Sequence, residues 1–489
     1  MTPDIRIFQK NNQPVQENRD FVLYWMIANR RLEWNFSLQR AVEEANRLQK
    51  PLVVLEALRS GYRWASDRLH TFVIEGMIDN KAYAATKGVC YYPYVEMESN
   101  AGRGLLKELA SRACCVVTDY FPCFFLPKMV DSAAQKIDVR LEAIDSNGIY
   151  PLSHPERDFT TAASFRRHLQ KNILPFITNL PKASPLDDLQ HKDIDISDIQ
   201  NQWSITEPSQ ILSENFLLNI PINHDIKPVS KKGGRQQALE VAKTFLKSKV
   251  QRYHTDRNAL ENGAASGLSP YIHFGHISVH ELVDAIINKE HWTPQNVAPK
   301  PNGSRDGWWG MSKGSESLMD ELITWRELGY VFCHRNLDDY DKLSSLPDWA
   351  LKTIEEHKSD ERPTIYTLEQ MANAQTHDKL WNAAQRQLVQ DGVIHNYVRM
   401  LWGKKVYEWS ANAEEAIQNL IELNNRYAID GRNPNSYSGI FWITGRFDRA
   451  WGPVRPIFGK LRYMASGSTQ KKLKTANYER RFAKDSLGI

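Results

Sequence analysis

Several patterns that would assign a chain to a class at once are missing here. The 489 residues contain five cysteines and no C-x-x-C pair, so neither a disulfide framework nor a zinc ribbon is indicated. No glycine-rich G-x-G-x-x-G or G-x-x-x-x-G-K-[ST] motif follows an apolar run in the first half, which excludes a nucleotide site of the usual kind there. The opening MTPDIRIFQKNNQPVQENRD has no apolar core, and no later run could span a membrane. We therefore expect a cytoplasmic or nuclear protein.

An excess of charge of one sign is missing as well. Lys and Arg number 62 against 58 Asp and Glu, and the formal net charge of +4 indicates only a mild bias toward anionic partners. Basic residues nevertheless gather near the end of the chain, where they either follow a phosphate backbone or form a solvated surface. They are Arg446, Arg449, Arg455, Lys460, Arg462, Lys471, Lys472, Lys474, Arg480, Arg481 and Lys484.

The hydrophobic periodicity divides the chain into unlike parts. Residues 21–57 predict a strand, then a helix with an apolar face, then a second strand, and the runs VCYYPYV, CCVVTDYF and IDVRLEAID predict further strands. We therefore predict a Rossmann-like α/β domain with a parallel sheet of about five strands over residues 1–180. Residues 181–234, rich in Pro, Asp and Ser, predict an interdomain linker. Helical periodicity then predicts an all-α domain over residues 235–489.

Tryptophan is concentrated in the second half, where ten of the 14 lie between Trp292 and Trp451. A large helical core explains most single tryptophans. Three features go beyond packing. Trp402 and Trp409 share a helix face with Arg399, and Glu321 and Trp325 place a carboxyl beside an indole, which raises a carboxyl pKa. The loop DGRNPNSYSGIFWITGRFDRAWGP mixes polar and aromatic side chains in a way that suits a buried planar ligand.

Longer runs carry a family resemblance. SGLSPYIHFGHIS, the run from DDYDKLSSLPDW to THDKLWNAAQ, and DGRNPNSYSGIFW resemble the photolyase/cryptochrome flavoproteins, specifically the class II cyclobutane pyrimidine dimer DNA photolyases. The opening strand FVLYWMIANRRLEWN is also similar to that family. The resemblance implies a helical domain that binds FAD and an α/β domain that holds an antenna chromophore, either 8-hydroxy-5-deazaflavin or a folate. It also implies UV-damaged DNA as the partner of a monomer.

The resemblance also implies roles for individual residues. Tyr253, Ser266, Leu268 and Ser269 would hold the flavin diphosphate, although the preceding Ala265 replaces a frequent hydroxyl. Arg399 and Asp430 would form an ion pair against the isoalloxazine, Asn424 would face flavin N5, and Asn435 would complete the cofactor site. An amide at N5 can hydrogen-bond a protonated nitrogen without adding charge.

On the substrate side, Trp325 and Trp442 correspond to the aromatics that grip a flipped-out dimer, and Glu321 corresponds to the acid that binds its 5′ base. Asp448 and Arg449 would fill the gap left in the duplex. Trp402, Trp381 and Trp409, in that order from the flavin outward, correspond to an electron-transfer chain that ends near solvent. The resemblance thus implies light-driven dimer repair by electron transfer from excited, reduced FAD.

Alternatives and departures remain. His273, His276 and His280 lack supporting cysteine or carboxylate ligands, so we predict no metal site. The segment GVIHNYVRMLW departs from the family's usual GKMHGYMRMYW, which predicts a reshaped dimer pocket. A cryptochrome-like FAD blue-light photoreceptor without repair activity is the alternative function, and repair of (6-4) photoproducts is disfavoured because no matching histidine pair is evident.

Overall fold

The computed structural model describes residues 1–212 and 214–484, so residues 485–489 of the predicted helical domain lie outside the described residues. The chain forms two compact units that interleave along the sequence. The first comprises residues 1–156, 173–243 and 267–289, and the second comprises residues 157–172, 244–266 and 290–489. The segment predicted as a linker falls within the first unit. The three predicted domain ranges stay predictions.

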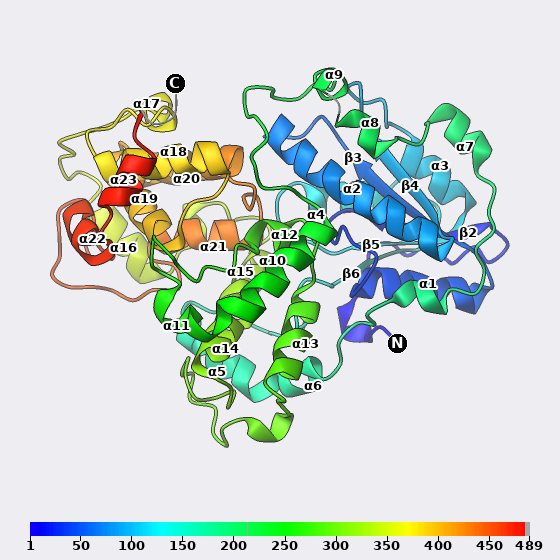
Figure 1. The fold of residues 1–489 in the computed structure, drawn as a ribbon, viewed down its shortest axis with the longest axis horizontal. Helices are drawn as coiled ribbons and strands as arrows, with labels where there is room; N and C mark the ends of the chain where they lie inside the picture. The colour runs from blue at the N-terminus through cyan, green and yellow to red at the C-terminus, as the bar shows by residue number, and fades with distance from the viewer. Residues whose placement is uncertain (213, 485–489) are drawn as a thin grey trace. The chain divides into compact units, whose positions relative to one another are not determined.

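A six-stranded sheet forms the centre of the first unit, in the order β1-β6-β5-β2-β3-β4 (Figure 1). Its strands are β1 (Ile7–Gln9), β2 (Phe21–Met26), β3 (Leu52–Leu58), β4 (Cys90–Val95), β5 (Ala113–Asp119) and β6 (Leu141–Ile144). Neighbours from β6 to β4 pair in parallel, which confirms the predicted α/β sheet. The antiparallel edge strand β1 was not predicted, because a three-residue strand is too short to show a period of two.

The apolar runs form buried strands because helices cover both faces of a parallel sheet. Every residue of β2 and β5 is buried. Helix α1 (Phe36–Leu48) and the end of α2 (Asp67–Lys87) contribute to one core cluster with β2 and β3, so these two helices share a face of the sheet. The strand order reverses between β2 and β5, and the right-handed crossover rule then places α3 (Leu105–Arg112) on the opposite face.

The carboxyl ends of β2 and β5 are joined by Asp119, which is fully buried. Its carboxylate accepts hydrogen bonds from the backbone N–H groups of Ile27, Ala28 and Asn29 at 2.8–2.9 Å. The hydroxyl of Tyr24 donates to the same carboxylate at 2.8 Å. Ligands of open α/β sheets often bind where the strand order reverses, and here protein groups occupy the point between these two strand ends.

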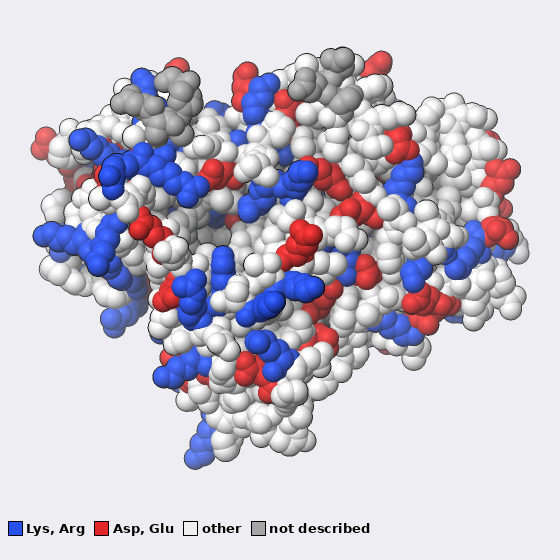
Figure 2. Space-filling view, viewed as in Figure 1, with Lys and Arg blue, Asp and Glu red and all other residues white. Residues whose placement is uncertain are grey.

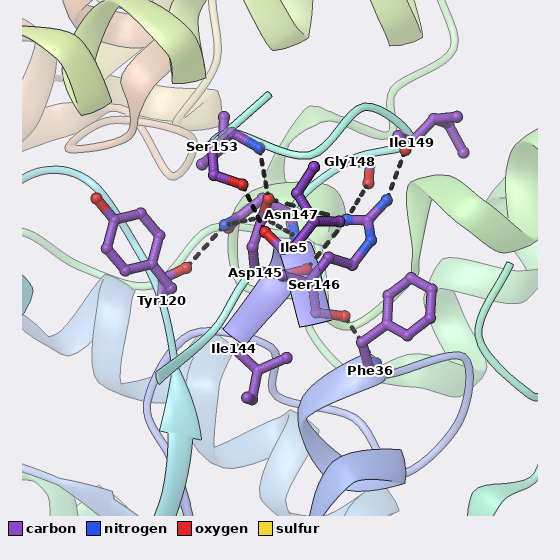
Figure 3. A network of polar contacts seen from close by, with 12 residues as sticks. Ile5, Phe36, Tyr120, Ile144, Asp145, Ser146, Asn147, Gly148, Ile149 and Ser153 are labelled. Atoms are coloured by element: carbon purple, nitrogen blue, oxygen red, sulfur yellow. Dashed lines mark hydrogen bonds and ion pairs between the residues drawn. The ribbon is translucent and has the colours of Figure 1, made fainter. Parts of the chain in front are cut away.

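A second polar network orders the loop that follows β6 (Figure 3). The guanidinium of Arg6, 1% exposed, donates to the carbonyl oxygens of Asp145 at 3.0 Å and Ile149 at 2.6 Å. The carboxylate of Asp145 accepts from the N–H of Leu152 at 2.8 Å, and Asn147 donates to the carbonyl of Tyr120 at 2.7 Å. Arg6, which directly precedes the edge strand β1, therefore ties it to the loop at the carboxyl end of β6.

Short helices complete the first unit. The predicted linker packs against the sheet domain, because Ile211, Leu217 and Ile220 join a core cluster with residues of α2. The remaining helices of this unit are α4 (Leu126–Ala134), α6 (Leu174–Ile177), α7 (Ser197–Gln202), α8 (Pro208–Ile211), α9 (Glu214–Leu217), α12 (Ser269–His273) and α13 (Val279–Lys289). Helix α10 (Arg235–Ser248) begins in the first unit and ends in the second.

The second unit is built from helices, as predicted for the C-terminal part. They are α5 (Ala162–Asn172), α11 (Tyr253–Asp256), α14 (Lys313–Met319), α15 (Arg326–Arg335), α16 (Asp348–Glu356), α17 (Leu368–Ala372), α18 (Lys379–Asp391), α19 (Asn396–Trp409), α20 (Ala413–Tyr427), α21 (Pro434–Ile443), α22 (Ser466–Leu473) and α23 (Ala476–Arg481). A π-helical turn (Asp320–Trp325) joins α14 to α15. None of the helices in the described part of the chain is long and apolar enough to cross a membrane.

Candidate functional site

The π-helical turn carries two of the predicted substrate residues, Glu321 and Trp325. Such turns interrupt α-helices rarely and occur frequently at functional sites. This one is fixed by a buried ion pair in which Arg166 Nε lies 2.6 Å from Asp320 Oδ1, and Nη2 lies 3.0 Å from Oδ2. The two side chains are 9% and 5% exposed. This bidentate ion pair therefore holds the π-helical turn in one position.

Glu321 forms an ion pair with Arg257, which the sequence prediction missed. Arg257 also donates to the Ser317 hydroxyl at 3.3 Å, and its guanidinium lies 5.8 Å from the Tyr253 ring centroid. Desolvation raises the pKa of Glu321 above its ordinary value, although Arg257 acts in the opposite direction. Arg257 follows the predicted flavin residue Tyr253 by four positions, about one helical turn, and this spacing is a signal that could have pointed to it.

Asn435 connects the π-helical turn to α21. Its side-chain amide donates to the carbonyl oxygens of Trp325 at 3.3 Å and Arg326 at 3.1 Å. Such close packing of α21 against α15 requires Gly329, because an added Cβ there would lie 2.8 Å from Ser438 Oγ and 2.9 Å from Asn435 Nδ2. Asn435, predicted as a cofactor ligand, thus supports the backbone beneath Trp325.

A pocket of about 340 Å³ opens beside the second predicted aromatic, Trp442. Its walls combine aromatic rings, basic side chains and a methionine, and they include Tyr397, Met400, Trp442, Trp451, Arg462 and Tyr463. Tyr397 and Met400 flank Arg399 in the sequence, so the predicted dimer aromatic and the predicted flavin-binding segment share this pocket. Its volume lies within the range typical of small-molecule sites.

Asp448 organises the rim of this pocket. Its carboxylate accepts from Trp451 Nε1 at 3.0 Å, from Arg462 Nε at 2.9 Å and from the Arg449 backbone N–H at 2.9 Å. Burial raises its pKa, but the hydrogen bonds from Arg462 and Trp451 outweigh burial and hold the pKa below its ordinary value. The side chain of Asp448 is 8% exposed, whereas Arg449 is exposed and lies over the Trp451 ring at 4.7 Å.

The predicted ion pair of Arg399 and Asp430 is present, with Nη2 3.2 Å from Oδ1. The Nε of Arg399 is buried and has no hydrogen-bond partner among the described residues. Asn424, 4% exposed, lies in the last turn of α20. The backbone carbonyl oxygen of Asn424 would lie 3.0 Å from a Cβ placed on Gly431, so the segment after Asp430 packs directly against the end of α20. These three predicted residues therefore occupy neighbouring positions.

The three indoles of the predicted electron-transfer chain are in contact in the predicted order. The rings of Trp402 and Trp381 are parallel within 4°, with centroids 6.3 Å apart, and Trp381 lies 5.5 Å from Trp409. The indole chain was predicted to end near solvent, but Trp409 is only 2% exposed and its ring is buried. The rings of Tyr366 and His377 cover it at 5.4 and 5.3 Å.

The remaining predicted residues are more dispersed. Tyr253 and Ser266 belong to the second unit, while Leu268 and Ser269 belong to the first, so their joint role at a diphosphate stays a prediction. His276 accepts a hydrogen bond from the Gly234 N–H at 2.9 Å, and burial lowers its pKa to about 3. Over residues 1–212 and 214–484, no three His, Cys, Asp or Glu side chains are placed to hold a metal ion.

Comparisons with known proteins decide the family. No family model matches the chain. The deoxyribodipyrimidine photo-lyase of Methanothermobacter thermautotrophicus is 31% identical over 478 residues, which cover 97% of this chain and 97% of that protein. This chain belongs to the deoxyribodipyrimidine photo-lyase family. A second member, from Oryza sativa subsp. japonica, is 32% identical over 94% of this chain and 86% of its own length.

A solved structure supports the fold. The class III photolyase of Agrobacterium tumefaciens matches with a TM-score of 0.64 at 16% identity, covering 95% of this chain and 86% of that one. Membership of the family confirms the predicted resemblance, the photo-lyase assignment and the α/β-plus-helical architecture. The class within the family and the roles of individual residues stay predictions.

Proposed function

We propose that this chain is a class II DNA photolyase that uses light and bound FAD to split cyclobutane pyrimidine dimers. The pocket beside Trp442 carries the proposal, because Tyr397 and Met400 in its wall flank Arg399. One cavity is thus bordered by a residue proposed to stack on the lesion and by the segment proposed to hold the flavin. Such proximity is what electron transfer between two bound molecules requires.

The chemistry of Arg399, Asp430 and Asn424 fits an isoalloxazine. The ion pair leaves one buried guanidinium N–H of Arg399 without a partner in the described residues, and a flavin carbonyl or ring nitrogen would accept from it. Asn424 supplies a neutral amide that can donate or accept without adding charge. When bound and reduced, FAD supplies the light-excited electron for dimer splitting. Arg399, Asp430 and Asn424 would bind and orient it.

The indole chain is proposed to carry electrons to the flavin site. Trp381 Nε1 donates to the Trp402 carbonyl oxygen at 3.0 Å, and Trp402 Nε1 donates to Gln385 Oε1 at 3.0 Å. These bonds fix both rings in a parallel stack. Core packing alone explains buried tryptophans, but it does not require three rings in continuous contact that start one helical turn from Arg399.

Trp325, Trp442 and Glu321 are proposed to bind the dimer after it leaves the duplex. A dimer within stacked DNA is out of reach of a buried cofactor, and its distorted stacking makes extrusion less costly than for normal bases. Glu321 sits where desolvation favours its neutral form, which can donate a hydrogen bond to a base carbonyl. Arg257 would have to release Glu321 for that proton to be retained.

The DNA backbone is proposed to contact the basic surface of the second unit. Figure 2 shows Lys and Arg side chains gathered over α22 and α23, the helices that contain Lys471, Lys472, Arg480 and Arg481. These groups would neutralise phosphates without reading sequence. Arg449, exposed beside Trp451, is proposed to enter the gap left by the extruded dimer.

The first unit is proposed to hold the antenna chromophore. Its loops after β3 and β5 bring together the rings of Tyr62, Trp64, Phe124 and Phe125 at centroid distances of 4.7–6.1 Å. A planar chromophore binds well among such rings. An absorption band beyond that of FAD in the purified protein would identify 8-hydroxy-5-deazaflavin or a folate, and a spectrum of FAD alone would contradict this part of the proposal.

Repair is tested by exposing UV-treated DNA to the FAD-loaded, chemically reduced protein under blue light, with a dark sample as control. Loss of dimers only in light is the expected result. A protein that binds FAD but leaves the dimers intact when reduced would be a photoreceptor instead. We further propose that the protein acts as a monomer in the cytoplasm or nucleus, which size-exclusion chromatography and localisation would test.

A further inference from the structure

A lysine that the sequence analysis did not single out lies close to the ring of Trp442. Lys404 is on α19 and is 0% exposed, which is unusual for a lysine. Its Nζ donates to the carbonyl oxygen of Ile443, the last residue of α21, at 2.6 Å. The same Nζ lies 5.4 Å from the ring centroid of Trp442, within the range of a cation–π contact.

Lys404 lies near the indole but does not line the pocket. Trp442 borders the 340 Å³ pocket, whereas Lys404 is fully buried and does not reach it. Arg462 does border the pocket, and its guanidinium lies 5.1 Å from the Trp442 centroid. Trp442 thus has two cations near its ring, the half-buried Arg462 at the pocket and the fully buried Lys404 within the protein.

We propose that Lys404 is a positioning residue that holds Trp442 from the protein side and, through its own charge, makes recognition of the dimer depend on pH. The inference rests on the proposed function, because it assigns Trp442 to lesion binding. Lys404 touches neither the pocket nor any reacting group, so its effect passes through the indole and through the end of α21.

The direction of the pH dependence follows from the surroundings of Lys404. Burial lowers its pKa to about 7, while Asp448 acts to raise the pKa and Arg462 acts to lower it. Below pH 7 the ammonium is charged and makes both the hydrogen bond and the cation–π contact. Above pH 7 the neutral amine keeps an N–H donor but loses the attraction to the ring. Trp442 is therefore held more firmly at lower pH.

The test on DNA uses the full-length, FAD-loaded protein in the dark. Fluorescence anisotropy gives Kd for a duplex with one cyclobutane dimer and for the same duplex without it, from pH 6.0 to 8.5 at constant ionic strength. Losing a desolvated cation–π contact should weaken the preference for the dimer by about tenfold between these limits. Lys404→Met should show the weak preference at every pH, and Lys404→Arg, charged throughout, should show no step near pH 7.

A second measurement needs neither DNA nor light. Protein labelled with 5-fluorotryptophan gives a fluorine NMR signal for Trp442, assigned by its loss in Trp442→Phe. That signal should titrate near pH 7 in the unmodified chain and should not titrate in Lys404→Met. A Trp442 signal that does not move, or one that titrates equally in Lys404→Met, would overturn the inference. Failure to distinguish dimer from undamaged DNA at any pH would instead overturn the proposed function.

Discussion

The ion pair beneath the π-helical turn offers a direct test of how the candidate site is held. In Arg166→Met, the carboxylate of Asp320 stays buried, 5% exposed, without its bidentate partner. The variant also loses the hydrogen bond from Arg166 Nη1 to the Gly303 carbonyl oxygen at 3.2 Å. Removing one partner of a buried ion pair typically costs about 3–5 kcal/mol, because the remaining charge is uncompensated.

Hydrogen exchange measures this cost locally, which suits a chain of two compact units better than a single unfolding midpoint. We expect amide protection in residues 320–335 to fall by about 10²–10⁴-fold in Arg166→Met, since each tenfold change corresponds to about 1.4 kcal/mol. Arg167→Met is the matched control, because Arg167 lies on the same helix and makes an exposed hydrogen bond to Asn302. Its effect should stay within about 0.5 kcal/mol.

A double variant separates loss of the pair from loss of packing. Arg166→Met combined with Asp320→Leu removes both charges and should restore most of the protection, because an apolar replacement of a whole buried ion pair is often neutral or stabilising. The reasoning is refuted if Arg166→Met lowers protection by less than tenfold. It is also refuted if the double variant is less protected than the single one.

Further predictions concern other parts of the second unit. Trp402→Phe should slow photoreduction of bound FAD far more than it slows repair by protein reduced beforehand, and equal slowing in absorption and repair assays would remove Trp402 from the proposed chain. Lys404 has a folded-state pKa lowered to about 7, so its burial destabilises the fold fully below pH 7 and progressively less as pH rises toward its unfolded value near 10. Denaturant unfolding followed by tryptophan fluorescence should therefore show the unmodified chain gaining up to about 1.4 kcal/mol per pH unit between pH 8 and 9, relative to Lys404→Met. Gly329→Ala should cost about 1–3 kcal/mol, because its Cβ would meet Ser438 Oγ at 2.8 Å, whereas Gly439→Ala on α21 meets nothing within 4 Å and should be neutral or stabilising in the same assay.

The parts of the fold that the sequence predicts are those with long, regular patterns. The five parallel strands are mainly apolar runs, and the helix at residues 36–48 has a clear apolar face and an Asn35 N-cap. The edge strand β1 was missed because three partly exposed residues carry no pattern. It follows Arg6, which donates hydrogen bonds to carbonyl oxygens about 140 positions later, and no local pattern can indicate such a contact.

The candidate site likewise contains residues that the sequence predicts and residues that it does not. The indoles, Arg399, Asp430 and Asn424 match individual positions of a known family, so their proximity could be predicted from the resemblance. Arg257 pairs with Glu321 from 64 positions away in the sequence. Lys404 is notable because it is completely buried, and the sequence of a helix does not show that a lysine is buried. The π-helical turn is a third case, because its sequence DELITW fits an ordinary α-helix equally well.

The hydrogen bonds of the two stacked indoles determine what happens to a proton when either ring is oxidised. The N–H of Trp381 points at a peptide carbonyl and the N–H of Trp402 at a side-chain amide oxygen. Both acceptors are far too weakly basic to take that proton. An electron vacancy on either ring would therefore keep its positive charge and remain free to move along the stack, instead of being trapped as a neutral radical.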